Sequence, residues 1–187
     1  AGRLWGKKAG LAVMIVDITK AALSIWTVYL LINLTGLANA VSLWRGGMAY
    51  YYLASLGATL GHCWPLYANF RGGKAVSALA GMVVATSWFL SIFGMVFFVI
   101  LKNKKFVSLS SIIASSTVVL AALAMFLTDY FVPGSFNFGM WGNGKLFLVG
   151  WDYFATILII TIILIFRHHE NIKRLARNEE NKVRWIK

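Results

Sequence analysis

The sequence predicts an all-α polytopic membrane protein, with residues 1–187 forming a single integral membrane domain. Of the 187 residues, 59% are hydrophobic and only 13% are charged, whereas a soluble domain carries roughly 25% charged residues. The apolar residues form runs comparable to the about 20 residues that cross a bilayer. The polar residues between these runs recur at positions that belong to one side of the membrane. We expect about six transmembrane or half-spanning helices.

The first apolar run, residues 9–32, contains two charged residues. Asp17 and Lys20 are three positions apart, so they lie on one face of a helix, where pairing lowers the cost of burying both. A shorter run, residues 47–62, ends at Gly61–His62 and returns the chain to its starting side. The expected membrane segments are residues 9–32, 47–62, 75–101, 107–128 and 146–166, separated by loops that include 33–46 and 129–145.

Fifteen of the eighteen Lys and Arg residues lie where the positive-inside rule assigns them to the cytoplasm. Segment 75–101 begins after Lys74 and ends before Lys102, so a single crossing would place Lys102 on the opposite side. We therefore expect two short helices that turn back, with a break near Thr86–Ser87 or Gly94, since a turn buried in protein is tolerated at membrane depth. A single crossing is the alternative. The fifteen are Arg3, Lys7, Lys8, Arg71, Lys74, Lys102, Lys104, Lys105, Arg167, Lys173, Arg174, Arg177, Lys182, Arg184 and Lys187.

The net charge of +12 favours anionic lipids or anionic substrates as partners. Nucleic acid is not expected, because the basic residues flank membrane segments and form no separate basic domain. The single cysteine, Cys63, excludes an internal disulfide. No metal site is expected, because His62, His168 and His169 have no carboxylate pair nearby in the sequence.

A glycine-rich stretch ends at Lys74, where a helix is expected to begin. Glycines such as Gly72 and Gly73 let the backbone approach a phosphate, and free N–H groups at a helix start favour an anion. The spacing is not that of a nucleotide-binding Walker loop. The alternative interpretation is a tight turn between helices with an interfacial lysine.

A second polar cluster follows the last apolar run. His168 and Asn171 are three residues apart and share a helical face, whereas His169 and Glu170 point elsewhere. A histidine at the membrane interface can bind phosphate or act as an acid or base; the alternative is a solvated helix. Ser108 stands at another expected helix start on this side, where its hydroxyl can cap the helix or donate to an anion.

Together the two clusters resemble the bacterial acyl-phosphate:glycerol-3-phosphate acyltransferases. The family's central motif, G-H-x-x-P followed by F-K/R-G-G-K-G-x-A-T, is matched by GHCWPLYANFRGGKAVSA, residues 61–78. Its C-terminal motif, R-H-x-x-N-I-x-R-L followed by E-x-K, is matched by RHHENIKRLARNEENK, residues 167–182. The start, AGRLWGKKAG, resembles the segment that follows the family's first motif. The resemblance covers essentially the whole chain in order.

Three departures accompany the resemblance. The family's first helix and its G-S-G-N-x-G-x-T-N loop would precede Ala1, so we expect an N-terminally truncated fragment of a seven-helix protein, inactive by itself, in which only Arg3 represents that region. The family's glycine after G-G-K is Ala75 here, and its A-T pair is Ser77–Ala78.

The resemblance implies transfer of a fatty acyl group from acyl phosphate to the 1-hydroxyl of glycerol 3-phosphate, giving lysophosphatidic acid and phosphate, the first step of bacterial phospholipid synthesis. It implies no cofactor or metal. The expected setting is the bacterial inner (plasma) membrane, with a cytoplasmic active site in a monomer whose functional partner is the enzyme that makes acyl phosphate. By the same resemblance, His168 and Asn171 are catalytic, Arg3, Lys74, Gly72, Gly73 and Ser108 bind substrate phosphate, and His62 and Glu180 are further motif positions.

Direct attack by the glycerol hydroxyl needs no enzyme nucleophile, because acyl phosphate is already an activated anhydride. The proton acceptor is either a substrate phosphate oxygen, with His168 orienting it, or His168 itself. Two other functions are weighed against this one. A small-solute or ion transporter with Asp17, Lys20 and His62 in its path would distribute polar residues through the membrane depth. A non-enzymatic membrane subunit would not explain why both motifs occur together.

Overall fold

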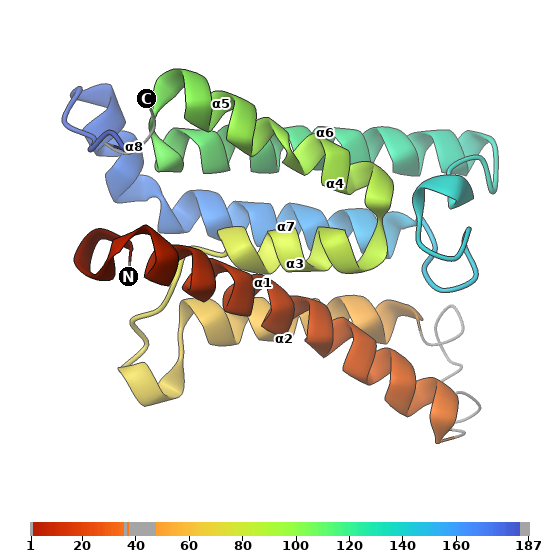
Figure 1. Cartoon of the computed structure of the whole chain (residues 1–187). Coiled ribbons are helices and arrows are strands. Elements are labelled where there is room, and N and C mark those ends of the chain that lie inside the picture. Colours follow the sequence, from red (N-terminus) through yellow and green to blue (C-terminus); the bar gives the residue numbers. More distant parts are fainter. Residues whose placement is uncertain (1, 36, 38–47, 184–187) are drawn as a thin grey trace.

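The computed structural model describes residues 2–35, 37 and 48–183, and this part of the chain is built from eight α-helices and two short 3-10 helices, with no strand. The helices lie side by side in an elongated bundle (Figure 1). This confirms the predicted all-α class. The helices are α1 (Gly2–Leu34), α2 (Met48–Cys63), α3 (Val76–Thr86), α4 (Trp88–Gly94), α5 (Val96–Lys104), α6 (Val107–Phe131), α7 (Trp151–Arg167) and α8 (His169–Ala176), with 3-10 turns η3 (Leu66–Ala68) and η4 (Asn137–Gly139).

Within the described ranges, two helices are long and apolar enough to cross a membrane, Lys8–Leu34 and Val107–Phe131. The bent pair α7–α8 adds a third if it is counted as one span. The helices α1, α2 and α6 match the expected segments, and α1 extends beyond 9–32 at both ends. The predicted loop 33–46 falls mostly outside the described residues.

Segment 75–101 turns back on itself, as the charge distribution predicted. Helix α3 runs away from Lys74, Ser87 is extended, and α4 and α5 return toward the end of the bundle where α6 begins (Figure 1). The expectation of two helices is wrong in number, because the return arm breaks again at Met95, directly after Gly94. Glycine is a poor helix former, which favours a break at this position.

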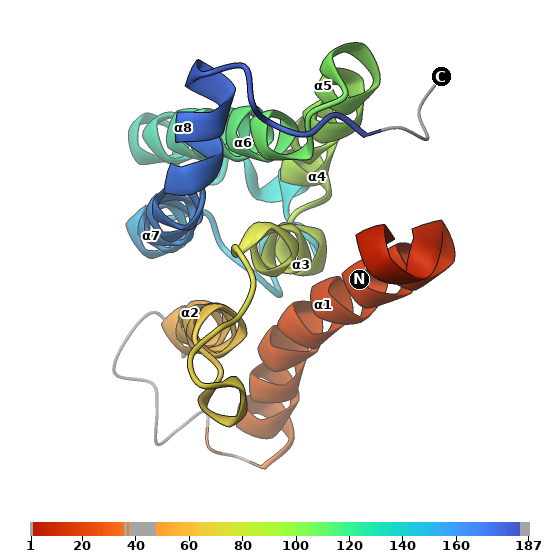
Figure 2. The same ribbon diagram turned by 90° about the vertical axis from the view of Figure 1, so that its left-hand side faces the viewer.

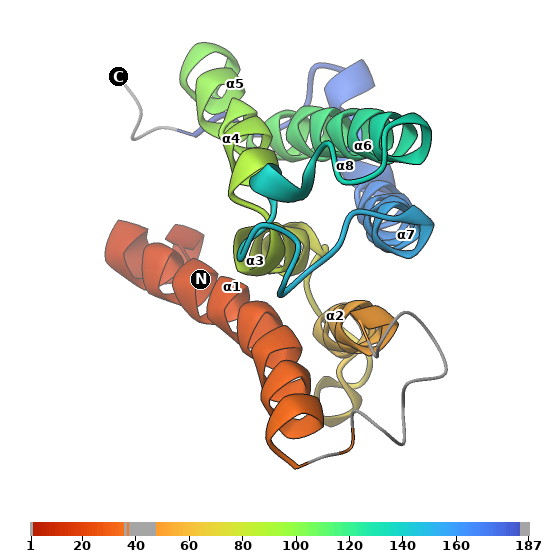
Figure 3. The same cartoon turned by 90° about the vertical axis from the view of Figure 1, so that its right-hand side faces the viewer.

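The turn at Ser87 is buried under the loop that follows α6 (Figure 3). Ser87 Oγ donates to the carbonyl of Gly139 at 2.7 Å and accepts from the amide of Leu90 at 3.2 Å. The amide of Trp141 donates to the carbonyl of Thr86 at 3.1 Å. The break therefore has hydrogen-bond partners within the protein for the carbonyl of Thr86 and the amide of Leu90. We call Trp88, Phe89 and residues 136–141 the aromatic cap.

Helix α7 begins at Trp151, five residues later than the predicted segment 146–166. The preceding residues 146–150 form no helix and carry the fully buried ring of Phe147 into the core. The hydroxyl of Tyr52 donates to the carbonyl of Leu148 at 2.8 Å. The prediction failed here because these apolar residues contact α1 and α2 as an irregular segment, and hydrophobicity alone does not distinguish such a buried segment from a helix.

Candidate active site

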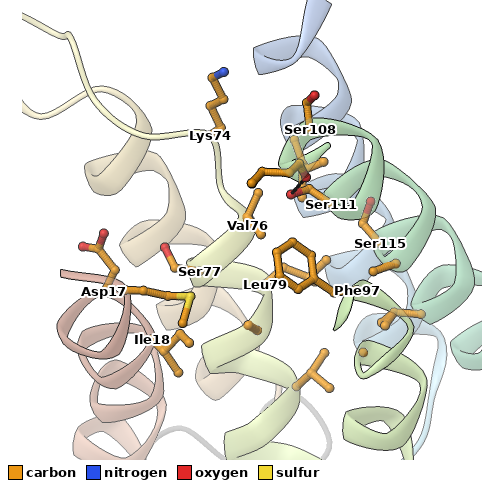
Figure 4. Close-up of a pocket in the computed structure, with 18 of the residues that line it drawn as sticks. Asp17, Ile18, Lys74, Val76, Ser77, Leu79, Phe97, Ser108, Ser111 and Ser115 are labelled. Carbon is orange, nitrogen blue, oxygen red and sulfur yellow. Dashed lines mark hydrogen bonds between the residues drawn. The ribbon is translucent and has the colours of Figure 1, made fainter. Parts of the chain in front are cut away.

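A pocket of about 580 Å³ lies between α1, α3, α4–α5 and α6. Viewed from the end of the bundle where α1 and α6 begin, α3 lies centrally between α1 and α6 (Figure 2). Lys74 and Ser108 stand at one end of the pocket, and Val76, Leu79 and Phe97 line it further along (Figure 4). The pocket thus joins a polar end to an apolar chamber. Its polar lining includes Lys74, Ser108, His168, Asn171 and Glu180.

The polar end is held by a hydrogen-bond network centred on Glu180. Lys74 Nζ donates to Asn171 Oδ1 at 2.5 Å, and Asn171 Nδ2 donates to Glu180 Oε1 at 2.9 Å. The same carboxylate oxygen accepts from Ser108 Oγ at 3.0 Å, and Arg174 Nε donates to Glu180 Oε2 at 2.9 Å. A residue of the C-terminal tail therefore connects α6 with α8 and, through Asn171, with Lys74 just before α3.

Glu180 remains ionised in this network. Burial by itself would raise the pKa of its carboxyl group, but hydrogen bonds from Arg174, Asn171 and Ser108 outweigh burial and lower the pKa below its ordinary value. A carboxylate is an acceptor only, so Glu180 orients both the amide of Asn171 and the hydroxyl of Ser108.

His168 lies at the corner between α7 and α8, whose axes bend by 56°. Its side chain is buried, and Nδ1 lies 2.8 Å from the carbonyl oxygen of Leu164. Because a carbonyl only accepts, Nδ1 carries the proton and Nε2 presents a lone pair. Burial, helped by the charge of Lys74, lowers the pKa of His168 despite the opposing effects of Leu164 and Glu180. The ring is therefore neutral at pH 7.

The predicted helical face of the second cluster is confirmed. His168 and Asn171 are buried, with 3% and 7% of their surfaces exposed, whereas the side chains of His169 and Glu170 are 57% and 56% exposed. The alternative of a solvated helix is wrong for His168 and Asn171. Ser108 does not cap α6, since its hydroxyl donates to Glu180, and it lines the pocket in register with Ser111 and Ser115.

The glycine-rich stretch owes its glycines to close approach by the end of α2. A Cβ at Gly72 would lie 2.1 Å from the carbonyl oxygen of His62, and a Cβ at Gly73 would lie 1.9 Å from His62 Nε2. The amide of Gly73 donates to the His62 carbonyl at 2.9 Å, so it is not free for an anion as the sequence suggested. The G-H-x-x-P half of the central motif, which begins at the end of α2, thus packs directly against its glycine-rich half.

Arg167 holds the same stretch from the other side, a role that sequence reasoning missed. Its Nε and Nη2 atoms donate to the carbonyls of Gly73 and Gly72 at 3.1 and 3.0 Å, and its guanidinium lies 5.5 Å from the ring centroid of Trp64. The only sequence signal was its place as the first residue of the C-terminal motif. The side chain of Arg3 lies outside the described part of the structure, so its predicted role stays a prediction.

Fold and pocket together define a helical membrane protein with a cationic site at one end of an apolar chamber. Among the described residues, no three His, Cys, Asp or Glu side chains gather as a metal site would require.

Comparison with known proteins identifies the family. Residues 1–178 match the family described as glycerol-3-phosphate acyltransferase. A glycerol-3-phosphate acyltransferase of Staphylococcus aureus (strain Newman) is 32% identical over 186 residues, which cover 98% of this chain and 78% of that relative. The corresponding protein of Staphylococcus aureus (strain bovine RF122 / ET3-1) is 33% identical over 186 residues, which again cover 98% of this chain and 78% of that relative. The chain belongs to the glycerol-3-phosphate acyltransferase family.

Two solved structures share the fold. The crystal structure of PlsY (YgiH), an integral membrane glycerol 3-phosphate acyltransferase, in its glycerol 3-phosphate form superposes with a TM-score of 0.70 at 24% identity, covering 97% of this chain and 74% of that one. Its lysophosphatidic acid form gives a TM-score of 0.69 at 24% identity, with coverages of 97% and 76%.

Proposed function

We propose that this protein transfers a fatty acyl group from acyl phosphate to the 1-hydroxyl of glycerol 3-phosphate, releasing lysophosphatidic acid and phosphate. The observation that carries the proposal is one pocket whose cationic, hydrogen-bonded end continues into an apolar chamber. Such a pocket suits two anionic substrates, one of which has an acyl tail. The family and the names of its relatives support glycerol 3-phosphate as the acceptor.

The reaction requires the two substrates to be positioned more than it requires either of them to be activated. The 1-hydroxyl oxygen attacks the carbonyl carbon of the anhydride, the bond from that carbon to the phosphate oxygen breaks, and the hydroxyl proton leaves with the phosphate. Lys74 offsets the charge that develops on oxygen. His168 accepts a hydrogen bond from the hydroxyl through Nε2 and orients it, whereas its lowered pKa makes it a weak final base. A phosphate oxygen is therefore the final proton acceptor.

The distribution of basic residues also supports a membrane orientation for the protein. We assign the protein to the bacterial inner membrane, with the pocket's polar end at the cytoplasmic face, because the basic residues gather at that end of the bundle. An enzyme that makes acyl phosphate would supply the donor.

The direct test is lysophosphatidic acid formation by the purified full-length gene product in lipid bilayers, measured by mass spectrometry. We expect product from palmitoyl phosphate and glycerol 3-phosphate, and none when glycerol replaces glycerol 3-phosphate. Product from palmitoyl-CoA but not from palmitoyl phosphate would contradict the donor assignment. No product from any acyl donor would contradict the function.

A second test addresses the apolar chamber. Gly94 lines the pocket, and a Cβ there would meet no atom within 4 Å. Gly94→Leu places a side chain in this space, so we expect the preference among acyl phosphates to shift toward shorter chains. Gly57→Leu is the matched control, because Gly57 also has open space around its Cβ position but does not line the pocket. An unchanged preference in Gly94→Leu would place the acyl chain elsewhere.

A further inference from the structure

Three polar residues from α1 and α2 meet at the edge of the pocket, which Asp17 itself lines, in a cluster with no role in the proposed chemistry. Asp17 and Lys20 pair at 2.5 Å, as the sequence predicted. His62 joins them from α2, with Nδ1 lying 3.0 Å from Lys20 Nζ and 3.6 Å from Asp17 Oδ1. His62 is also the residue that contacts Gly72 and Gly73.

The contact with Lys20 fixes the state of the histidine ring. An ammonium group only donates, so Nδ1 of His62 is the acceptor, and Nε2 carries the proton in the neutral ring. Asp17 pairs with the lysine in turn, which favours the rotamer of this long, flexible side chain that reaches His62. Only 10% of the His62 side chain is exposed, so the ring has little freedom to rotate.

The ring thereby sets the position of the backbone that leads to Lys74. Its Nε2 edge fills the space where a Cβ of residue 73 would lie, while the His62 carbonyl accepts the amide of Gly73. Arg167 holds the Gly72 and Gly73 carbonyls from the opposite side. The peptide before Lys74 is therefore clamped between His62 and Arg167, and only the His62 side is anchored to α1.

We propose that Asp17, Lys20 and His62 are positioning residues, which hold the Gly72–Gly73 backbone so that Lys74 meets the phosphate of glycerol 3-phosphate. This inference rests on the proposed function. Glycerol 3-phosphate is small and water-soluble, so its phosphate supplies most of its binding. Acyl phosphate is also held by its tail in the apolar chamber. A displaced Lys74 therefore weakens binding of glycerol 3-phosphate more than that of the acyl donor.

The test uses Lys20→Met, which keeps an unbranched side chain one atom shorter and removes the donor, and His62→Phe, which keeps a ring but removes both nitrogens. In the full-length protein we expect the KM for glycerol 3-phosphate to rise by about tenfold in each variant, because small displacements of a binding group are costly. The KM for acyl phosphate should stay within about twofold of wild type, as expected for a loss confined to one substrate. Lys20→Arg, which retains a donor, should recover most of the affinity.

Lys173→Met is the matched control, because Lys173 forms an i,i+3 pair with Glu170 at 3.1 Å on the exposed face of α8, away from His62. Unchanged KM values in Lys20→Met and His62→Phe would overturn the inference. So would a loss of kcat in parallel with the folded fraction, with no change in KM, since that result indicates a purely structural role. A wild-type protein that fails to acylate glycerol 3-phosphate would instead refute the proposed function, and this inference with it.

Discussion

The two ends of α3 are held by donors of different charge. Where the chain enters α3, the carbonyls of Gly72 and Gly73 accept from the guanidinium of Arg167. Where it leaves α3, the carbonyls of Val84 and Thr86 accept from the indole and backbone N–H groups of Trp141. The carbonyls at the exit belong to the last turn of α3, which a helix leaves unpaired, whereas those at the entry belong to the loop before α3. Charged donors add a positive potential that attracts anions, whereas neutral donors add none, so only the first end suits phosphate.

The largest expected effect separates the two ends directly. Lys74→Ala and His168→Ala should each lower kcat/KM for glycerol 3-phosphate acylation by about a hundredfold or more, a loss of about 3 kcal/mol in transition-state stabilisation. Lys145→Ala, in the exposed loop at the aromatic-cap end, should leave kcat/KM unchanged. Steady-state kinetics of the full-length protein make this comparison. Normal turnover in either pocket variant would remove that residue from the site.

The next effect concerns the charged network. Glu180→Gln removes a carboxylate that accepts from Arg174, Asn171 and Ser108, so we expect about 2 kcal/mol less stability at pH 7. The folded-state pKa of Glu180 is lowered, so its contribution is complete above its ordinary pKa of 4.5 and is lost as the pH falls through the lower folded-state value. Thermal unfolding should therefore show a difference between the two proteins at pH 7 that shrinks below pH 4.5.

Glu170→Gln is the control for this comparison, because the side chain of Glu170 is 56% exposed and its partner is a surface lysine. We expect little change in its unfolding temperature. A stability difference for Glu180→Gln that grew on acidification would contradict the assigned protonation state.

At the aromatic-cap end we expect a change in stability without a change in catalysis. Ser87→Ala removes the hydroxyl that accepts from the amide of Leu90 and leaves the Gly139 carbonyl without its donor, which should cost about 1 to 2 kcal/mol. The KM and kcat measured below the unfolding temperature should match wild type. Thr128→Ala, whose exposed hydroxyl donates only within α6, should have little effect on stability. A changed KM in Ser87→Ala would show that the two ends are coupled.

The smallest effect should be a gain. Ala75 has a φ of 63°, a left-handed conformation that favours glycine over alanine by about 1 kcal/mol. Ala75→Gly should therefore raise the free energy of unfolding by up to about 1 kcal/mol. Ala78→Gly, in the helical part of α3, should lower it by a similar amount. Chemical denaturation of both variants tests the opposite signs; a destabilised Ala75→Gly protein would show that burial of the Ala75 methyl outweighs the strain.

Local patterns predicted those features that depend on spacing or on charge sidedness. The i,i+3 separations placed Asp17 with Lys20 and His168 with Asn171 on shared faces, because helical periodicity fixes these neighbours. The alternation of basic residues around 75–101 predicted that the segment reverses. Spacing could not predict that Glu180 binds Ser108, 72 residues away, or that Arg167 reaches Gly73, 94 residues away. Such contacts depend on how whole helices dock.

By itself, then, the sequence determined the helical membrane class, the reversal after α3 and the end of the bundle where charge gathers, because hydrophobic run length and charge placement act locally. Only the tertiary structure explains why residues 72 and 73 are glycines. The end of α2 fills the space beside them, and their carbonyls face Arg167. The tertiary structure also decided which charged residues line the pocket and which, like Lys20, lie behind it. Both features depend on distances between helices, and no periodicity in a single sequence encodes such distances.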